Sequence, residues 1–138
     1  MASTLKINTL TGVTTAGSIA VTGEGNSTTT NLQQGLCKCW VNFDGTASGA
    51  ASRDSFNVSG MTDDGTGRAT ITINSDMSNV NYSCSDSVGD HNDTSESVAF
   101  SYLHTQATGS VGIFSAHYDG GAFSDRSNVS VQICGDLA

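Results

Sequence analysis

The strongest constraint on the fold is a two-residue alternation between Leu36 and Gly45, the stretch that holds the single tryptophan of the chain. Apolar side chains occupy every second position here, and the positions between them hold a charge, an amide and the indole: Cys37, Cys39, Val41 and Phe43 against Lys38, Trp40 and Asn42. A strand sends alternate side chains to opposite faces, so this stretch predicts a strand with one fully apolar face.

Trp40 lies on the opposite face of this predicted strand, where a large indole needs cover. Two kinds of cover are open: a subunit interface, or a loop of the same chain. Trp40 is therefore a candidate interface residue.

The composition favours β structure throughout. The 138 residues include no proline and 16 glycines, and Ser, Thr and Asn are abundant. Thr, Val, Ile and aromatic residues suit pleated surfaces, whereas Gly, Asn, Asp and Ser suit turns. We expect an all-β chain with little helix.

Further strand signals recur at regular spacing after the tryptophan strand. The alternating sets are Phe56 and Val58; Ala69, Ile71 and Ile73; Val80, Tyr82 and Cys84; Val98, Phe100 and Tyr102; and Val129, Val131 and Ile133, with a further apolar run at residues 111–114. Residues 45–53 and the hydrophilic run 85–97 are expected to be loops, and 63–67 a turn. This spacing predicts an antiparallel β-sandwich, jelly-roll-like, over residues 31–138.

Residues 1–30 form a separate N-terminal extension in this interpretation. Two short strands are expected at 5–9 and 18–22, then a polar linker at 24–30, and a helical turn at 31–35 with Thr30 as its cap. A two-stranded hairpin alone is marginal in water, so the extension must pack on copies of itself, as in a trimeric stalk, or on its own sandwich. The candidate oligomer interface is Leu5, Ile7, Leu10, Ile19, Val21 and Trp40.

Charge and hydropathy restrict the partners. The formal charge of −8 lacks the clustered Lys and Arg that a phosphate backbone requires, so nucleic acid is not expected. No apolar run reaches the roughly 20 residues that span a bilayer, and the N-terminus has no signal-peptide pattern, so no membrane insertion is expected.

The four cysteines leave two alternatives open. Cys37 and Cys39 lie too close on one strand face to pair with each other. Without an export signal we expect buried free thiols, with Cys84 in the core and Cys134 on the face opposite Val129, Val131 and Ile133. One or two disulfides formed late are the alternative.

Catalytic and metal-binding patterns are weak. The histidines lie among oxygen-rich loops, but nothing matches a twelve-residue calcium loop, a zinc site or a nucleophile elbow. We therefore expect no enzyme activity, cofactor or metal. A loop with aromatic and hydrogen-bonding groups suits surface recognition, and Phe123 is either part of it or tucked into the core. The candidate recognition residues are His91, Asp93, His117, Tyr118, Asp119 and Arg126.

Several motifs resemble fibre-like virion proteins of marine bacteriophages, especially those of cyanobacteria. The opening MASTLKINTL (1–10) resembles the start of such proteins. NLQQGL (31–36), WVNFDGT (40–46), RDSFNVS (53–59), TDDGTG (62–67) and VSVQICGD (129–136) are similar to a module of phage tail-fibre and minor structural proteins. The resemblance covers most of residues 1–84 and 127–136, and residues 85–97 and 104–126 depart from it.

This resemblance implies a homotrimeric virion protein, assembled in the host cytoplasm, that acts in attachment or host-surface recognition. Its implied partners are copies of itself and other virion proteins of the tail or capsid, with a host-surface glycan or receptor left open. The alternative is a capsid decoration or head-fibre protein that clamps the shell. The resemblance supplies no catalytic residues.

Overall fold

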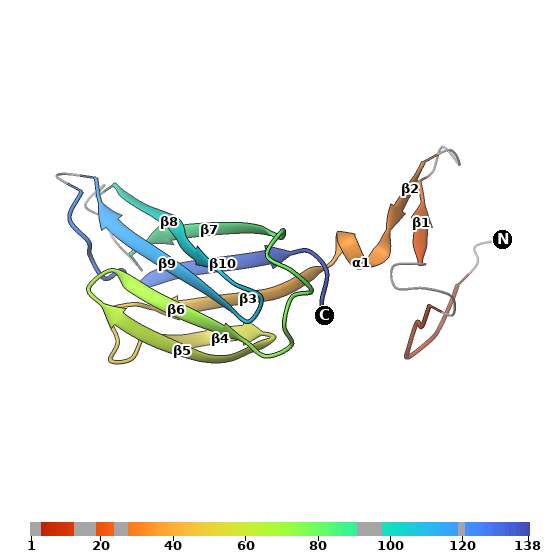
Figure 1. The fold of residues 1–138 in the computed structure, drawn as a ribbon, viewed down its shortest axis with the longest axis horizontal. Coiled ribbons are helices and arrows are strands. Elements are labelled where there is room, and N and C mark those ends of the chain that lie inside the picture. Colours follow the sequence, from red (N-terminus) through yellow and green to blue (C-terminus); the bar gives the residue numbers. More distant parts are fainter. Residues whose placement is uncertain (1–3, 13–18, 24–27, 91–97, 119–120) are drawn as a thin grey trace. The chain divides into compact units, whose positions relative to one another are not determined.

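The computed structural model describes residues 4–12, 19–23, 28–90, 98–118 and 121–138 (Figure 1). The chain forms two units, Met1–Leu36 and Cys37–Ala138. The sequence analysis predicted this boundary after residue 30. In the structure the helical turn at residues 32–35 contacts the short strand that precedes it, so the turn belongs to the first unit.

In the described part of the first unit there are two short antiparallel strands, β1 (Ala20–Thr22) and β2 (Thr29–Asn31), and the single-turn helix α1 (Leu32–Gly35). The predicted helical turn is confirmed, but its cap is Asn31, whose side chain accepts a hydrogen bond from the backbone N–H of Gln34. Residues 5–9, predicted to be a strand, lie in a described segment without strand structure. The partner of β1 is instead the end of the predicted linker, because two adjacent β-branched threonines favour extended backbone.

The described residues of the second unit form eight antiparallel strands. They are β3 (Cys37–Asp44), β4 (Ala51–Phe56), β5 (Val58–Gly65), β6 (Arg68–Ile73), β7 (Ser83–Gly89), β8 (Ala99–Gln106), β9 (Ser110–His117) and β10 (Asn128–Cys134). Two four-stranded sheets result, ordered β4-β3-β10-β7 and β5-β6-β9-β8, and Figure 1 shows them as two layers. The prediction of an antiparallel all-β chain is confirmed.

Both sheets contribute their inner faces to one hydrophobic core. The alternation that predicted strands on β3, β6 and β10 also identified their inward side chains, since these are buried while their neighbours, apart from Lys38, are partly or fully exposed. The core positions on these three strands are Cys39, Val41, Phe43, Ala69, Ile71, Ile73, Val129, Val131 and Ile133. Apolar burial on this scale is the main stabilising contribution to such a unit.

The edges of the two sheets are connected. Asn57, at φ 58°, is the single residue between edge strands β4 and β5, and its side chain bonds the backbone of Lys38 and Ser75. At the other edge the Ser101 hydroxyl of β8 donates to the carboxylate of Asp86 in β7. These links leave each sheet with an inner face in the core and an outer face available to solvent or partners.

Two predicted loops are strands. Residues 45–53 were expected to be a loop, but Ala51 begins β4; residues 85–97 were expected to be a loop, but β7 extends to Gly89. β7 is hydrophilic because most of its outward residues are serines, and only Cys84 and Val88 pack against the core. The predicted strand at 80–84 starts three residues later, and Val80 is exposed. Pairing with β10, rather than local hydrophobicity, makes this segment a strand.

Candidate functional site

The outer face of the β5-β6-β9-β8 sheet carries a cluster of rings, which we call the aromatic face. Its members are Arg68, Phe100, Tyr102, His104, Phe114 and Phe123. The register explains the cluster, because Arg68 of β6 and Tyr102 of β8 both stand opposite Phe114 of β9. Residues opposite one another share a face of the sheet, so three strands bring these side chains into one row.

The rings of the aromatic face hold one another in place. Phe114 meets Tyr102 edge to face at 5.2 Å between centroids, and the imidazole of His104 stacks on it at 3.9 Å. The Arg68 guanidinium lies 4.6 Å from the Phe123 ring centroid and 5.2 Å from that of Phe114. Each such contact contributes about 0.5–1 kcal/mol, so the face is ordered before any partner binds.

The aromatic face is open to solvent at β8. Phe100 is 39% exposed and Tyr102 41% exposed, while the alternate residues Ala99, Ser101 and Leu103 are half-buried. The alternation at Val98, Phe100 and Tyr102 correctly predicted a strand. However, the large side chains Phe100 and Tyr102 point outward, and the side chains between them point inward. Beside it, Asp64, Thr66, Arg68 and Phe123 line a shallow depression of about 220 Å³.

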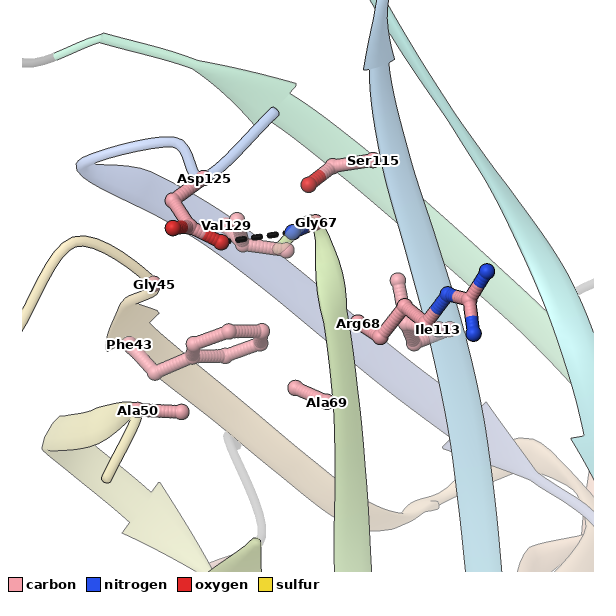
Figure 2. Close-up of a pocket in the computed structure, with 10 residues that line it drawn as sticks. All are labelled: Phe43, Gly45, Ala50, Gly67, Arg68, Ala69, Ile113, Ser115, Asp125 and Val129. Atoms are coloured by element: carbon pink, nitrogen blue, oxygen red, sulfur yellow. Dashed lines mark hydrogen bonds between the residues drawn. The ribbon is translucent and has the colours of Figure 1, made fainter. Parts of the chain in front are cut away.

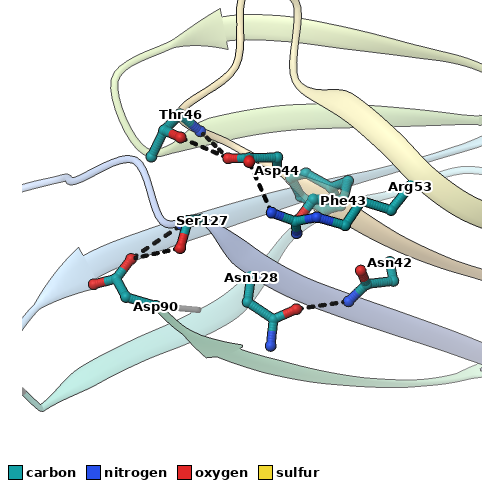
Figure 3. Close-up of polar contacts among 8 residues, drawn as sticks. All are labelled: Asn42, Phe43, Asp44, Thr46, Arg53, Asp90, Ser127 and Asn128. Carbon is teal, nitrogen blue, oxygen red and sulfur yellow. Dashed lines mark hydrogen bonds and ion pairs between the residues drawn. The ribbon is translucent and has the colours of Figure 1, made fainter. Parts of the chain in front are cut away.

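The outer face of the other sheet carries a groove of about 390 Å³, which we call the polar groove. Its outward side chains come from β3, β10 and β7: Trp40, Asn42, Ser85, Ser87, Ser130 and Gln132. Trp40 is half-buried at one side of this groove, so the indole finds part of its cover on its own sheet. The Asn42 amide donates to Asn128 Oδ1 at 2.7 Å, as Figure 3 shows, and to Ser130 Oγ at 2.8 Å.

A charged turn closes the end of β3. Asp44 accepts a 2.6 Å hydrogen bond from the Thr46 hydroxyl and pairs with Arg53 at 2.7 Å (Figure 3). The Thr46 hydrogen bond, with a smaller contribution from the positive charge of Arg53, lowers the pKa of the Asp44 carboxyl. The Arg53 Nη1 also donates to the Phe43 carbonyl, so this pair fixes the β3–β4 connection rather than offering a free charge.

The predicted recognition residues do not form one site in the described part of the chain. His91, Asp93 and Asp119 lie outside the described residues. Tyr118 is 70% exposed, directly after the half-buried His117 at the end of β9. Arg126, by contrast, is only 3% exposed and pairs with Asp90 at 2.5 Å, so its guanidinium is not part of an exposed loop surface. Asp90 is further fixed by the N–H and hydroxyl of Ser127 (Figure 3).

Phe123 is not in the core, contrary to one of the two alternatives for it. Its ring packs on Phe114 and under Arg68, on the outer face. An isolated antiparallel β-bridge between Phe123 and Ala116 of β9 holds Phe123 in this position. The sequence could not reveal this position, because it depends on a contact between a loop and a strand.

A small cavity lies where the core meets the loop before β10 (Figure 2). Phe43, Ala69, Ile113 and Val129 form much of its lining, and its volume is about 10 Å³. That is the space of one water molecule, so the cavity does not accommodate an organic ligand.

The four cysteines are free thiols, but the expected burial holds only for Cys39, since Cys37, Cys84 and Cys134 are half-buried. Burial raises the pKa of Cys39 to about 11, and the neighbouring Cys37 and Cys84 add to the shift. Burial, with a contribution from the Asp86 carboxylate, also raises the pKa of Cys84 to about 11. Within the described residues, no group of three His, Cys, Asp or Glu side chains is placed to hold a metal ion.

The first unit exposes most of its large apolar side chains. Four of the six predicted interface residues are at least half exposed: Leu5 79%, Ile7 50%, Leu10 54% and Val21 51%. Ile19 is half-buried, and its carbonyl accepts the N–H of Leu32. No helix among the described residues has the length and apolarity to cross a bilayer.

No protein-family model, curated protein or solved structure matches the chain. The resemblance to phage fibre-like proteins therefore stays a prediction from the quoted motifs.

Proposed function

We propose that the chain is a non-enzymatic virion structural protein, a homotrimeric tail-fibre-like appendage for bacteriophage attachment or host-surface recognition. In this proposal the first unit mediates self-association, and residues 37–138 form a jelly-roll-like β-sandwich that presents binding surfaces. The observation that carries the binding role is the aromatic face. A preordered group of exposed rings beside an arginine is typical of contact surfaces, since aromatic and arginine side chains dominate binding energies.

The trimer is supported by the exposed apolar side chains of the first unit. Leu5, Ile7, Leu10 and Val21 contact water in a single chain, and each would gain about 1.5–3 kcal/mol on full burial. Association around a three-fold axis would bury them against their counterparts and present three copies of the binding surface. Three weak sites held together gain avidity, because later contacts occur at high effective concentration.

A capsid decoration or head-fibre protein is the second candidate. The same exposed apolar set of the first unit favours it, because these side chains could bind shell proteins as well as sister chains. A decoration protein clamps neighbouring subunits through interface area, and it needs no receptor-binding site.

Light scattering on the full chain tests the shared part of both candidates. We expect a mass three times that of the 14.1 kDa chain. A variant with Leu5→Ser, Ile7→Ser and Val21→Ser should dissociate, whereas a Thr72→Ala variant, changed on an exposed position of β6, should remain a trimer. A monomeric wild-type chain at micromolar concentration contradicts the trimer.

Antibody labelling of virus particles from a culture that produces the chain separates the two candidates. Label at the tail supports attachment, and label spread over the head supports decoration. Particles without label contradict both. If the aromatic face is the attachment surface, a trimeric Phe100→Ser, Tyr102→Ser variant should lose binding to host cells while Thr72→Ala retains it.

A further inference from the structure

The polar groove is built from cross-strand rows, which makes it a repeating surface rather than an accidental hollow. Trp40, Gln132 and Ser85 are partners across β3, β10 and β7. Asn42, Ser130 and Ser87 form the next row on the same face. Residues paired in this way stand side by side, so the six side chains form a two-row surface with the indole at one corner.

None of the outward side chains that line this groove is charged. On the same outer face, Lys38 precedes Trp40 along β3 and Asp54 stands opposite Asn42 on β4, but neither residue is part of the lining. Asp86 is next to the groove on β7, but its half-buried side chain points to the opposite face of the strand. There its carboxylate accepts a hydrogen bond from the Ser101 hydroxyl of the other sheet. Val41 and Val131, which also line the groove, have their side chains in the core. The outward lining of the groove therefore offers a ligand hydrogen bonds rather than ion pairs, although the chain as a whole has a formal charge of −8.

The groove offers hydrogen-bonding groups of both kinds. The Asn42 amide is oriented by its bonds to Asn128 and Ser130, which leaves its Oδ1 as an acceptor. Among the described residues, Gln132 Nε2 makes only a long 3.9 Å contact with the sulfur of Cys134. Within the described residues, the hydroxyls of Ser85 and Ser87 make no hydrogen bond to protein atoms, so they remain available to a ligand.

We propose that the polar groove is a second binding surface, separate from the aromatic face, and that it binds a neutral oligosaccharide; the assignment rests on the proposed recognition role of the protein. A sugar ring has an apolar face of C–H groups and a rim of hydroxyls. The indole of Trp40 offers a flat apolar surface for the C–H face of the sugar. The amides of Asn42 and Gln132 and the neighbouring serine hydroxyls offer hydrogen-bond donors and acceptors for the sugar hydroxyls.

The dimensions fit a short oligosaccharide. Neighbouring strands lie about 4.8 Å apart, so the two strand spacings from Trp40 to Ser85 span about 10 Å, close to the length of two pyranose rings. The groove volume of about 390 Å³ lies within the range of small-molecule sites. Phe56, the partner of Trp40 on β4 and 55% exposed, extends the aromatic end of the row for a further ring.

The single tryptophan makes the groove directly observable. Because Trp40 is the only indole in the chain, tryptophan fluorescence reports on this groove alone. The experiment titrates the full chain with lactose, maltotriose and tri-N-acetylchitotriose as neutral probes and with sialyllactose as an acidic probe. We expect a saturable blue shift of the Trp40 emission with at least one neutral probe. The shift with sialyllactose should be no larger than the shift with lactose.

Matched variants locate the response. Gln132→Ala and Ser85→Ala should each weaken binding of the responding probe at least ten-fold, and both lie on an exposed face where substitution leaves the fold intact. Thr72→Ala on the other sheet should bind as wild type. Tyr102→Ala should also bind as wild type, which separates the groove from the aromatic face.

Three outcomes of the sugar titration overturn the inference: no fluorescence response to any neutral probe, a response unaffected by Gln132→Ala and Ser85→Ala, or a stronger response to the acidic probe. A Trp40 emission that shifts on dilution without sugar assigns the groove to a second copy of the chain and also overturns it. Failure here leaves particle labelling and light scattering as independent tests of the proposed function.

Discussion

The backbone N–H of Gly67 donates a 2.5 Å hydrogen bond to the carboxylate Oδ1 of Asp125, which ties the β5–β6 turn to the segment leading into β10 (Figure 2). Gly67 has φ +66°, and its carbonyl accepts the N–H of Ser115. The turn is thus held from both neighbouring segments, at the end of the strand that begins with Arg68 of the aromatic face.

Gly67→Ala should destabilise the chain by at least about 2 kcal/mol in denaturant unfolding. An added Cβ would lie 2.4 Å from the Ser115 carbonyl oxygen and 2.7 Å from the Ser124 nitrogen, so the backbone must move. Gly121→Ala is the matched control, because its φ of +67° is nearly the same and no heavy atom of the described structure lies within 4 Å. Equal losses of unfolding free energy in the two variants would show that the close approach of Ser115 and Ser124 to Gly67 has no role.

Asn57 gives a second backbone test. Asn57→Gly keeps the positive φ of 58° easy to adopt but removes the side-chain bonds to Lys38 and Ser75, whereas Asn57→Ala removes the bonds and adds strain. We expect both variants to be destabilised, with Asn57→Ala about 1 kcal/mol less stable than Asn57→Gly in thermal or urea unfolding. An alanine variant as stable as the glycine variant would show that the connection between β4 and β5 is not strained.

The ion pair between the buried Arg126 and the partly exposed Asp90 should show strong coupling in a double-mutant cycle. Asp90→Asn leaves a 3% exposed guanidinium without its counter-charge and should cost about 3 kcal/mol in the free energy of unfolding. Adding Arg126→Met should recover part of this loss. In the described structure the Nε and Nη2 atoms of Arg126 already have no hydrogen-bond partner, so methionine removes an uncompensated desolvation cost. Additive effects of the two changes would contradict the coupling.

Stability should fall on the alkaline side. Burial raises the pKa of Cys39 and Cys84 from 9.0 to about 11 and that of Tyr82 from 10.0 to about 12. Each of these acidic groups keeps its proton to higher pH in the folded protein than in the unfolded chain. Its contribution to the free energy of unfolding is therefore complete below the pKa of the unfolded chain and is lost as the pH rises from about 9 towards 12. Urea unfolding at pH 7 to 11 should show this loss, and Cys84→Ala should reduce its slope. A stability that is constant up to pH 11 would contradict the burial of these groups.

The strands with a strict alternation were predictable in both position and facing. On β3, β6 and β10 one set of alternate residues is apolar and the other, apart from Trp40, is mostly polar, so only one face can enter the core. β8 shows where this reasoning stops. Phe100 and Tyr102 form its larger apolar set, yet they face outward, because Ala99, Ser101 and Leu103 suit the space beside β7.

The candidate sites were less predictable than the fold. Trp40 was identified as an outward indole, but its neighbours Gln132 and Ser85 are separated from it by 92 and 45 positions and meet it only through strand pairing. Arg126 looked like an exposed recognition residue because it lies in a polar segment, and the ion pair with Asp90 that buries it has no local signature.

By itself the sequence determined that this chain is β-structured, which of its strongest strands face the core, and that its first residues carry too few apolar side chains to form a core. These properties follow from side-chain period and composition, which are local. The tertiary structure alone decided that rings gather on one outer face and uncharged polar groups on the other. Pairing register between strands distant in the sequence sets both surfaces, and no local pattern records that register.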